Sequence, residues 1–158
     1  MNISKYLTLS EAIKSPTATR LGIDNLPDED QLVNMEYVAN EIFDPVREFV
    51  GGPLHASSFF RSKALNEAVP GSSKTSQHMT GQAIDIDCDT FGVGSNLEVF
   101  YFIRNNLIFD QLILEYPDET GKPSWIHVSK TKTKNRGEVL VKLKAKYIPF
   151  SLYLVGMV

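Results

Sequence analysis

The sequence predicts an α+β fold, in which a small, mainly antiparallel sheet carries a metal site on one face and helices pack on the other. Apolar residues recur at helical spacing between residues 32 and 50, which predicts a main core helix. Segments 83–89 and 124–129 alternate apolar and polar residues, which predicts half-buried strands. Both segments carry histidine or aspartate on the polar side, and those side chains are metal ligands.

The chain of 158 residues suits a single domain, 1–158, because this length can bury one real core. We expect that core to span about residues 7–143, followed by a C-terminal tail at 144–158. The apolar stretch from Tyr147 to Val158 could pack on the core or meet a partner, and the sequence leaves both open.

The first predicted element is a short helix. Thr8-Leu-Ser-Glu11 is a capping box, in which the first and last side chains satisfy backbone donors at a helix start. The helix is expected to run to about Lys14 and to end before Pro16, since a residue before proline disfavours helical angles. The segment from Thr17 to Pro27 is predicted to be loop.

The main helix is predicted to begin after 27–30, where Asp28, Glu29 and Asp30 favour a helix N-terminus. Pro45 should kink it because proline lacks a backbone donor, and the glycines at 51–52 should end it. Its predicted core positions are Leu32, Met35, Val38, Ala39, Ile42, Phe43, Val46, Phe49 and Val50.

A second capping box, Ser95-Asn-Leu-Glu98, predicts a helix that ends at about Asn106. Strands 111–115 and 125–129 are joined by a short loop, so we expect antiparallel neighbours. The expected core residues of the helix are Leu97, Phe100, Tyr101, Ile103 and Leu107. The other predicted elements are strands at 54–60 and 138–143, a helix at 62–69, and loops at 70–75, 89–94, 116–123 and 131–137.

His78 and Asp85 are the first two predicted metal ligands. Seven residues span roughly 10 Å in a helix and roughly 23 Å in a strand, which is too far for one shared ion. The chain must therefore turn back between them, and Gly81 permits the turn because it lacks a Cβ.

The strand that begins at Ala83 places three carboxylates on one face, at Asp85, Asp87 and Asp89. Like charges at close range repel, and a divalent metal would relieve that cost. His127 lies on the polar face of the second alternating segment. Two histidines and one carboxylate leave one open position on a single tetrahedral Zn²⁺, which is typical of a catalytic site, although other transition metals also accept these ligands.

Composition excludes several function classes. A net charge of −3 provides no general attraction to nucleic acid, and we expect no membrane span because every apolar run is too short. The single Cys88 has no partner for an internal disulfide and is expected to be a small buried apolar residue. The N-terminal residues lack the apolar region of a signal peptide, so we expect synthesis in a cytoplasm without export by that route.

Two strings carry a resemblance to a known family: Ser76-x-His78-x-x-Gly81-x-Ala83-x-Asp85, and Trp125-x-His127 downstream. They resemble the M15 zinc peptidases, which include D-Ala-D-Ala carboxypeptidases and peptidoglycan endopeptidases, in the branch met in phage lysis and tail-associated proteins. Arg61 and Asn66 also fall where such proteins carry an Arg and an Asn, so the resemblance covers roughly residues 7–129. It implies a Hedgehog/D-Ala-D-Ala peptidase-like fold and a peptidoglycan peptide as substrate.

The resemblance leaves the general base to be found. Many M15-like proteins carry an acidic residue three positions before the last histidine, where this chain has Ser124. Glu115 is the best replacement, because pairing of strands 111–115 and 125–129 would bring its carboxylate near the metal, and Asp87 is the reserve. Arg61 is predicted to bind the substrate carboxylate or the carbonyl oxygen as charge develops.

Ser76 either orients its loop or contacts substrate, and Trp125 is either a groove wall for the peptide or a core residue. Three functions stay open: a D-Ala-D-Ala carboxypeptidase, an L-Ala-D-Glu type endopeptidase, and a non-catalytic phage structural or wall-binding module that keeps the metal for folding. A wall-directed enzyme made in a cytoplasm would reach the wall after lysis, through a holin, or with a virion.

Overall fold

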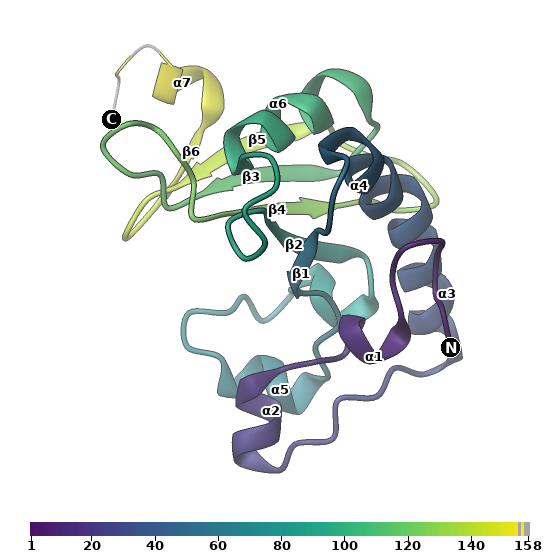
Figure 1. The fold of residues 1–158 in the computed structure, drawn as a ribbon. Helices are drawn as coiled ribbons and strands as arrows, with labels where there is room; N and C mark the ends of the chain where they lie inside the picture. The colour runs from purple at the N-terminus through teal and green to yellow at the C-terminus, as the bar shows by residue number, and fades with distance from the viewer. Residues whose placement is uncertain (155, 157–158) are drawn as a thin grey trace.

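The computed structural model describes residues 1–154 and 156, which form a six-stranded sheet flanked by helices (Figure 1). The strands are β1 (His55–Ser58), β2 (Ala83–Asp87), β3 (Gln111–Glu115), β4 (Trp125–Ser129), β5 (Glu138–Lys142) and β6 (Tyr147–Pro149). The helices are α1 (Leu9–Ala12), α2 (Pro16–Leu21), α3 (Glu29–Val38), α4 (Asp44–Val50), α5 (Lys63–Ala68), α6 (Asn96–Asn106) and α7 (Phe150–Leu154), with a π-helical turn η1 (Ala39–Phe43) and a 3₁₀ turn η2 (Gln77–Thr80).

The sheet confirms the prediction of a mainly antiparallel arrangement. Its strand order is β1-β2-β4-β3-β5-β6, and β3 pairs with β4 in the antiparallel manner that the short loop predicts. The one parallel pair is β3 with β5. It arises because β4 reverses the chain after β3 and the loop at 130–137 reverses it again, which returns β5 to the direction of β3 on the other side of that strand.

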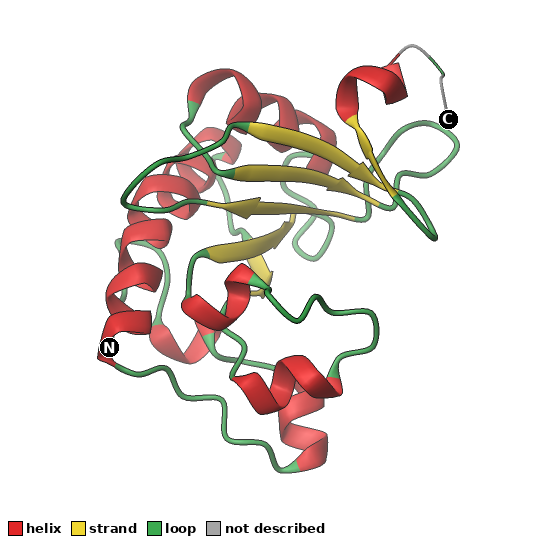
Figure 2. Cartoon of the chain, turned by 180° about the vertical axis from the view of Figure 1, so that it is seen from behind, coloured by secondary structure: helices red, strands yellow, loops and turns green. Residues whose placement is uncertain are grey.

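Helices α4 and α6 lie side by side and cover one face of the sheet (Figures 1 and 2). Helix α3 packs against β2, and α6 packs against β3 and β4. The alternation within the strands determines which face is covered, because Ile84, Ile86, Ile126 and Val128 are fully buried in this layer. No helix within residues 1–154 and 156 has the length and apolar content that crossing a membrane requires.

The short first helix begins as predicted, with a complete capping box between Thr8 and Glu11. The prediction of loop from Thr17 to Pro27 is wrong in its first part, where α2 forms. Ser15 accepts a hydrogen bond from the Ala18 backbone N–H, and Pro16 occupies the first turn, where its missing donor costs nothing. The serine–proline pair is thus a helix start.

The main helix forms as α3, η1 and α4 in succession. The proline at position 45 follows the π-helical turn, which is where a missing backbone donor interrupts the regular ladder. Gly51 ends the helix at φ 70°. The predictions that Phe49 and Tyr101 belong to the core are wrong: they are 48% and 37% exposed, because Phe49 stacks on Phe102 at the surface between α4 and α6.

The C-terminal stretch packs on the body as far as the structure describes it. Strand β6 pairs with β5, and Ile148 and Phe150 are buried. Residues 155, 157 and 158 of the predicted tail lie outside the described residues. The strand predicted at 83–89 forms as β2 but ends before Asp89. The Asp87 carboxylate accepts a hydrogen bond from the Asp89 backbone N–H, which turns the chain. Two carboxylates rather than three therefore lie on β2.

Candidate metal centre

His78, Asp85 and His127 converge, as the sequence predicts. One ligand atom from each residue lies within 4.8 Å of the other two. The three residues come from η2, β2 and β4, so the chain does turn back between the first two. Gly81 makes this turn at φ 71°, a left-handed conformation that favours glycine.

The β2–β4 ladder positions two of the three residues. Asp85 and His127 are direct partners in it, and the Nδ1 of His127 lies 2.9 Å from Oδ1 of Asp85. Directly opposed residues of an antiparallel pair project from the same face, so their side chains meet without help from a loop. The His127 side chain is 13% exposed, which leaves the pair accessible from one side.

His78 is held with its Nε2 atom toward the cluster. Its Nδ1 lies 2.6 Å from the backbone carbonyl oxygen of Phe59, which only accepts, so Nδ1 carries the proton and donates. Nε2 lies 3.3 Å from Oδ1 of Asp85. Burial lowers the pKa of His78 and favours the neutral ring, whose Nε2 lone pair is the form that binds a metal ion.

Asp85 is the shared carboxylate of the cluster. Burial alone would raise its pKa, but the facing imidazoles of His78 and His127 outweigh that effect and hold the pKa well below its usual range. Its second oxygen, Oδ2, lies 3.3 Å from a terminal nitrogen of Arg61, whose Nε donates to the Ser58 hydroxyl. The Arg61 side chain is 17% exposed, so it belongs to the wall of the site.

Glu115 lies on the same face of the sheet as His127. It pairs with Trp125, two residues before His127, and side chains two apart on a strand share a face. Burial raises the pKa of Glu115 to about 7, opposed by the charge of His127. A carboxylate with a pKa in this range is suited to proton transfer near neutral pH.

Ser124 stands where many M15-like proteins carry an acidic residue. Its backbone N–H donates to the Glu115 carbonyl and its hydroxyl donates to the Tyr116 carbonyl, so it joins the β3–β4 hairpin. The strand pairing places Glu115 beside this turn. Asp87, the reserve, is engaged elsewhere, because it accepts hydrogen bonds from the Asn96 side chain and from the Asp89 backbone N–H.

The other two predicted residues border the cluster. The Ser76 hydroxyl accepts a hydrogen bond from the His78 backbone N–H, which orients the η2 turn. Trp125 is half-buried, and its ring lies 5.3 Å from that of Tyr116, centroid to centroid. Its place in β4 puts it on the ligand-bearing face, two residues from His127.

Sequence reasoning missed four residues that support the cluster. The side chain of Gln77, next to His78, donates to Asp110, and Asp110 also accepts two side-chain hydrogen bonds from Arg136. Asn25 donates to the Phe60 carbonyl and accepts from the Ser62 backbone N–H, on either side of the arginine at 61. These contacts join residues distant in the chain, so no local pattern announces them.

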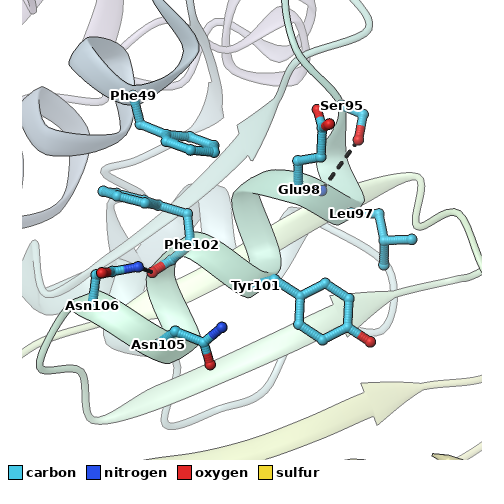
Figure 3. A pocket seen from close by; sticks show the side chains of 8 residues that line it. All are labelled: Phe49, Ser95, Leu97, Glu98, Tyr101, Phe102, Asn105 and Asn106. Atoms are coloured by element: carbon cyan, nitrogen blue, oxygen red, sulfur yellow. Dashed lines mark hydrogen bonds between the residues drawn. The ribbon is translucent and has the colours of Figure 1, made fainter.

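A separate hollow lies on the helical side of the molecule, and Figure 3 shows the side chains that line it. Its volume is about 360 Å³. It is lined by residues of α4 and α6, including the stacked rings of Phe49 and Phe102, and by Ser95, which caps the start of α6. None of the cluster residues lines it, so the predicted chemistry does not belong to this hollow.

Two comparisons relate the chain to known proteins. The family Peptidase M15 matches residues 5–129, which include every residue of the cluster. A solved structure described as the LdcB LD-carboxypeptidase is similar over 66% of this chain and 59% of its own, with 17% identity and a TM-score of 0.36. This chain thus spans less than two thirds of that protein. The search of curated proteins found no match to this chain. The family match extends over most of the sequence, and the chain belongs to the M15 peptidase family.

Proposed function

We propose that the protein hydrolyses a peptide bond in peptidoglycan stem peptides with one zinc ion held by His78, Asp85 and His127. The observation that carries the proposal is the donor set: a neutral Nε2, an imidazole Nδ1 and a carboxylate oxygen, all within 4.8 Å of one another. Three protein ligands leave the fourth position of a tetrahedral zinc free for solvent or substrate.

The donors fit zinc better than a hard cation, because imidazole suits zinc and other transition metals while calcium and magnesium prefer oxygen ligands. When bound, the ion would polarise a carbonyl and make a water molecule more acidic. The Phe59 carbonyl supports this use of His78, since a hydrogen bond to the other ring nitrogen fixes the orientation of a ligating imidazole.

Glu115 is proposed as the general base and then the general acid. Its burial and its pKa of about 7 support this role, because such a carboxylate can take a proton from water and return it to a leaving amine. Its place on the face that bears His127 supports the same role. The chain supplies no acid at Ser124, which leaves Glu115 as the nearest candidate on that hairpin.

Arg61 is proposed to act on the substrate as well as on Asp85. One of its terminal nitrogens pairs with Asp85 Oδ2, and its Nε is taken by Ser58, so the remaining donors can bind a carboxylate or a developing oxyanion. Ser76 and Trp125 are proposed to contact the peptide, from the η2 turn and from the start of β4 respectively.

The substrate class follows from the family resemblance, whose named activities act on peptidoglycan peptides. Two bonds remain candidates, the D-Ala-D-Ala bond cut by carboxypeptidases and the L-Ala-D-Glu bond cut by endopeptidases. We also propose that the protein acts on the wall after cell lysis or after delivery with a virion.

Metal analysis combined with muropeptide digestion tests the proposal. Purified protein should contain one zinc ion per chain, and mass spectrometry of digested muropeptides should reveal a single new product. Loss of a terminal D-alanine identifies a carboxypeptidase, and release of the stem at L-alanine identifies an endopeptidase. Bound zinc without any product would instead favour the non-catalytic module, and a protein that binds no zinc would refute the proposal.

A further inference from the structure

The ligand-bearing face of the sheet continues beyond the metal centre toward the C-terminal hairpin, which is formed by β5 and β6. In register order, Trp125 pairs with Glu115, Glu115 with Lys142, and Lys142 with Tyr147. Directly paired residues share a face, so this row crosses β4, β3, β5 and β6 on the side that bears His127. Val141 and Ile148, the chain neighbours of Lys142 and Tyr147, point to the other face and are buried in the core, as the alternation of a strand requires.

The outer half of this row comes from β5 and β6, which lie beyond the residues 5–129 that match the family (Figure 1). A hydrogen bond nevertheless joins this hairpin to the loop that follows β3. The Tyr116 backbone N–H donates to the Lys142 carbonyl at 2.9 Å, directly after Glu115 in the chain. Tyr116 has a φ of 47°, the one positive φ among the described non-glycine residues. The hairpin and the site therefore form a continuous surface.

Lys142 supplies a positive charge to that surface. Its ammonium lies 4.0 Å from the centre of the Tyr147 ring, which holds it over an aromatic face. Among the described residues, no carboxylate lies within the 4.0 Å of an ion pair with this ammonium. Its charge acts on Glu115, because it is one of the effects that oppose the raised pKa of that carboxyl.

Tyr147 forms the outer wall of the row. Its residue is 52% exposed, yet burial of its hydroxyl is the main cause that raises its pKa, followed by the charges of Glu115 and Tyr116. Its ring supports the ammonium of Lys142. Two cations then flank the cluster on opposite sides, with Arg61 beside β2 and Lys142 on β5.

We propose that Lys142 and Tyr147 form a subsite for a carboxylate of the substrate peptide, and that the peptide lies across the strands between Arg61 and this hairpin. The inference rests on the proposed peptidase function. A stem peptide offers free carboxylates in addition to the group at the scissile bond, and an ammonium held over a ring is a suitable partner for one of them. The subsite would select acidic stem peptides over their amidated forms.

Steady-state kinetics with two synthetic stem peptides test the subsite. One has free carboxylates along the stem and the other has those groups amidated, while both keep a free C-terminal carboxylate. Lys142→Gln should raise KM for the acidic peptide about five-fold, and any change in kcat that acts through Glu115 should be equal for the two peptides. KM for the amidated peptide should stay the same. The matched control is Lys144→Gln, which removes an exposed lysine that follows β5 and should change neither value.

Tyr147→Ala should also raise KM for the acidic peptide, and Tyr147→Phe, which keeps the ring under the ammonium, should restore it. An equal change in KM for both peptides in Lys142→Gln, or no change in KM for either, would overturn the subsite. Cleavage of neither peptide by the unmodified protein would count against the proposed function alone. Calorimetry of the zinc-loaded protein with both peptides then decides the subsite, since equal affinities or no binding would overturn it.

Discussion

His127 lies directly across the β2–β4 ladder from Asp85, with its Nδ1 atom 2.9 Å from the Oδ1 atom of that carboxylate. Two of the three candidate ligands are thus held by a pair of interior strands of the sheet. The third, His78, comes from a short turn whose position depends on several contacts.

Removal of one ligand should abolish zinc binding and the stability that zinc provides. A free zinc concentration of 100 times Kd should stabilise the wild-type fold by about 2.7 kcal/mol. His127→Ala should lose this gain, because two ligands remain. Thermal unfolding with and without zinc, together with metal content, measures both effects. His55→Ala, outside the cluster on β1, is the control, and a His127→Ala variant that still gains stability from zinc would contradict the assignment.

Glu115→Gln should keep the zinc ion and lose hydrolysis. The amide preserves the size of the side chain but cannot take a proton, so turnover should fall by about 10² to 10⁴. Metal content and the rate of muropeptide cleavage are the two measurements. Glu119→Gln, in the exposed loop after β3, is the matched control. Near wild-type cleavage by Glu115→Gln would end the candidacy of this residue.

The metal-free protein should lose stability as pH rises through the titration of Glu115. Burial raises the pKa of this carboxyl from 4.5 to about 7, so the folded state binds its proton more tightly than the unfolded chain. The protonated form therefore stabilises the fold at low pH, and this contribution is lost between pH 4.5 and about 7. Urea unfolding across that window should show a flatter profile for Glu115→Gln, and parallel profiles would contradict the burial argument.

Asp110→Asn should weaken the support of the turn that carries the histidine ligand. The Arg136 guanidinium and its backbone N–H hold the pKa of Asp110 below its ordinary value of 3.8. The ionised form thus stabilises the fold above pH 3.8, and this contribution is lost as pH falls through the lower folded value. The substitution should cost about 2 kcal/mol at neutral pH.

Equilibrium unfolding at neutral and acid pH checks this expectation. The difference between the wild-type protein and Asp110→Asn should shrink in acid, and a difference independent of pH would speak against the ion pair. Asp24→Asn, at an exposed loop position, serves as the control. Zinc affinity should also fall in Asp110→Asn, since Gln77 would lose the anionic acceptor of its side-chain hydrogen bond.

Gly81→Ala should cost more than an ordinary substitution in a turn. A Cβ at this position would meet the Gln31 carbonyl oxygen at 2.5 Å and the Met35 side chain at 2.8 Å, in addition to the strain of φ +71°. We expect a loss of about 2 kcal/mol or more. Gly71→Ala is the control, because its φ of +74° is similar and nothing lies within 4 Å of the new atom. Equal unfolding free energies for the two variants would refute the close-packing argument.

Much of the fold was predictable because its signals are local. The capping box at Thr8 placed the first helix, and the alternation at 111–115 placed β3 at its exact bounds. Local signals failed where two of them competed or where exposure depended on a distant neighbour. The pair at 15–16 started α2 instead of a loop, and Phe49 found a surface partner in place of the core.

Residue identity and spacing were enough to nominate His78, Asp85 and His127, because imidazole and carboxylate chemistry limits the candidate ligands and the glycine between the first two demands a turn. The folded chain added the parts that chemistry alone leaves open. Strand register brought Glu115 to the ligand-bearing face, and the Phe59 carbonyl set the tautomer of His78. Both contacts join residues from different segments of the chain. These segments meet only when the sheet and its helices pack together.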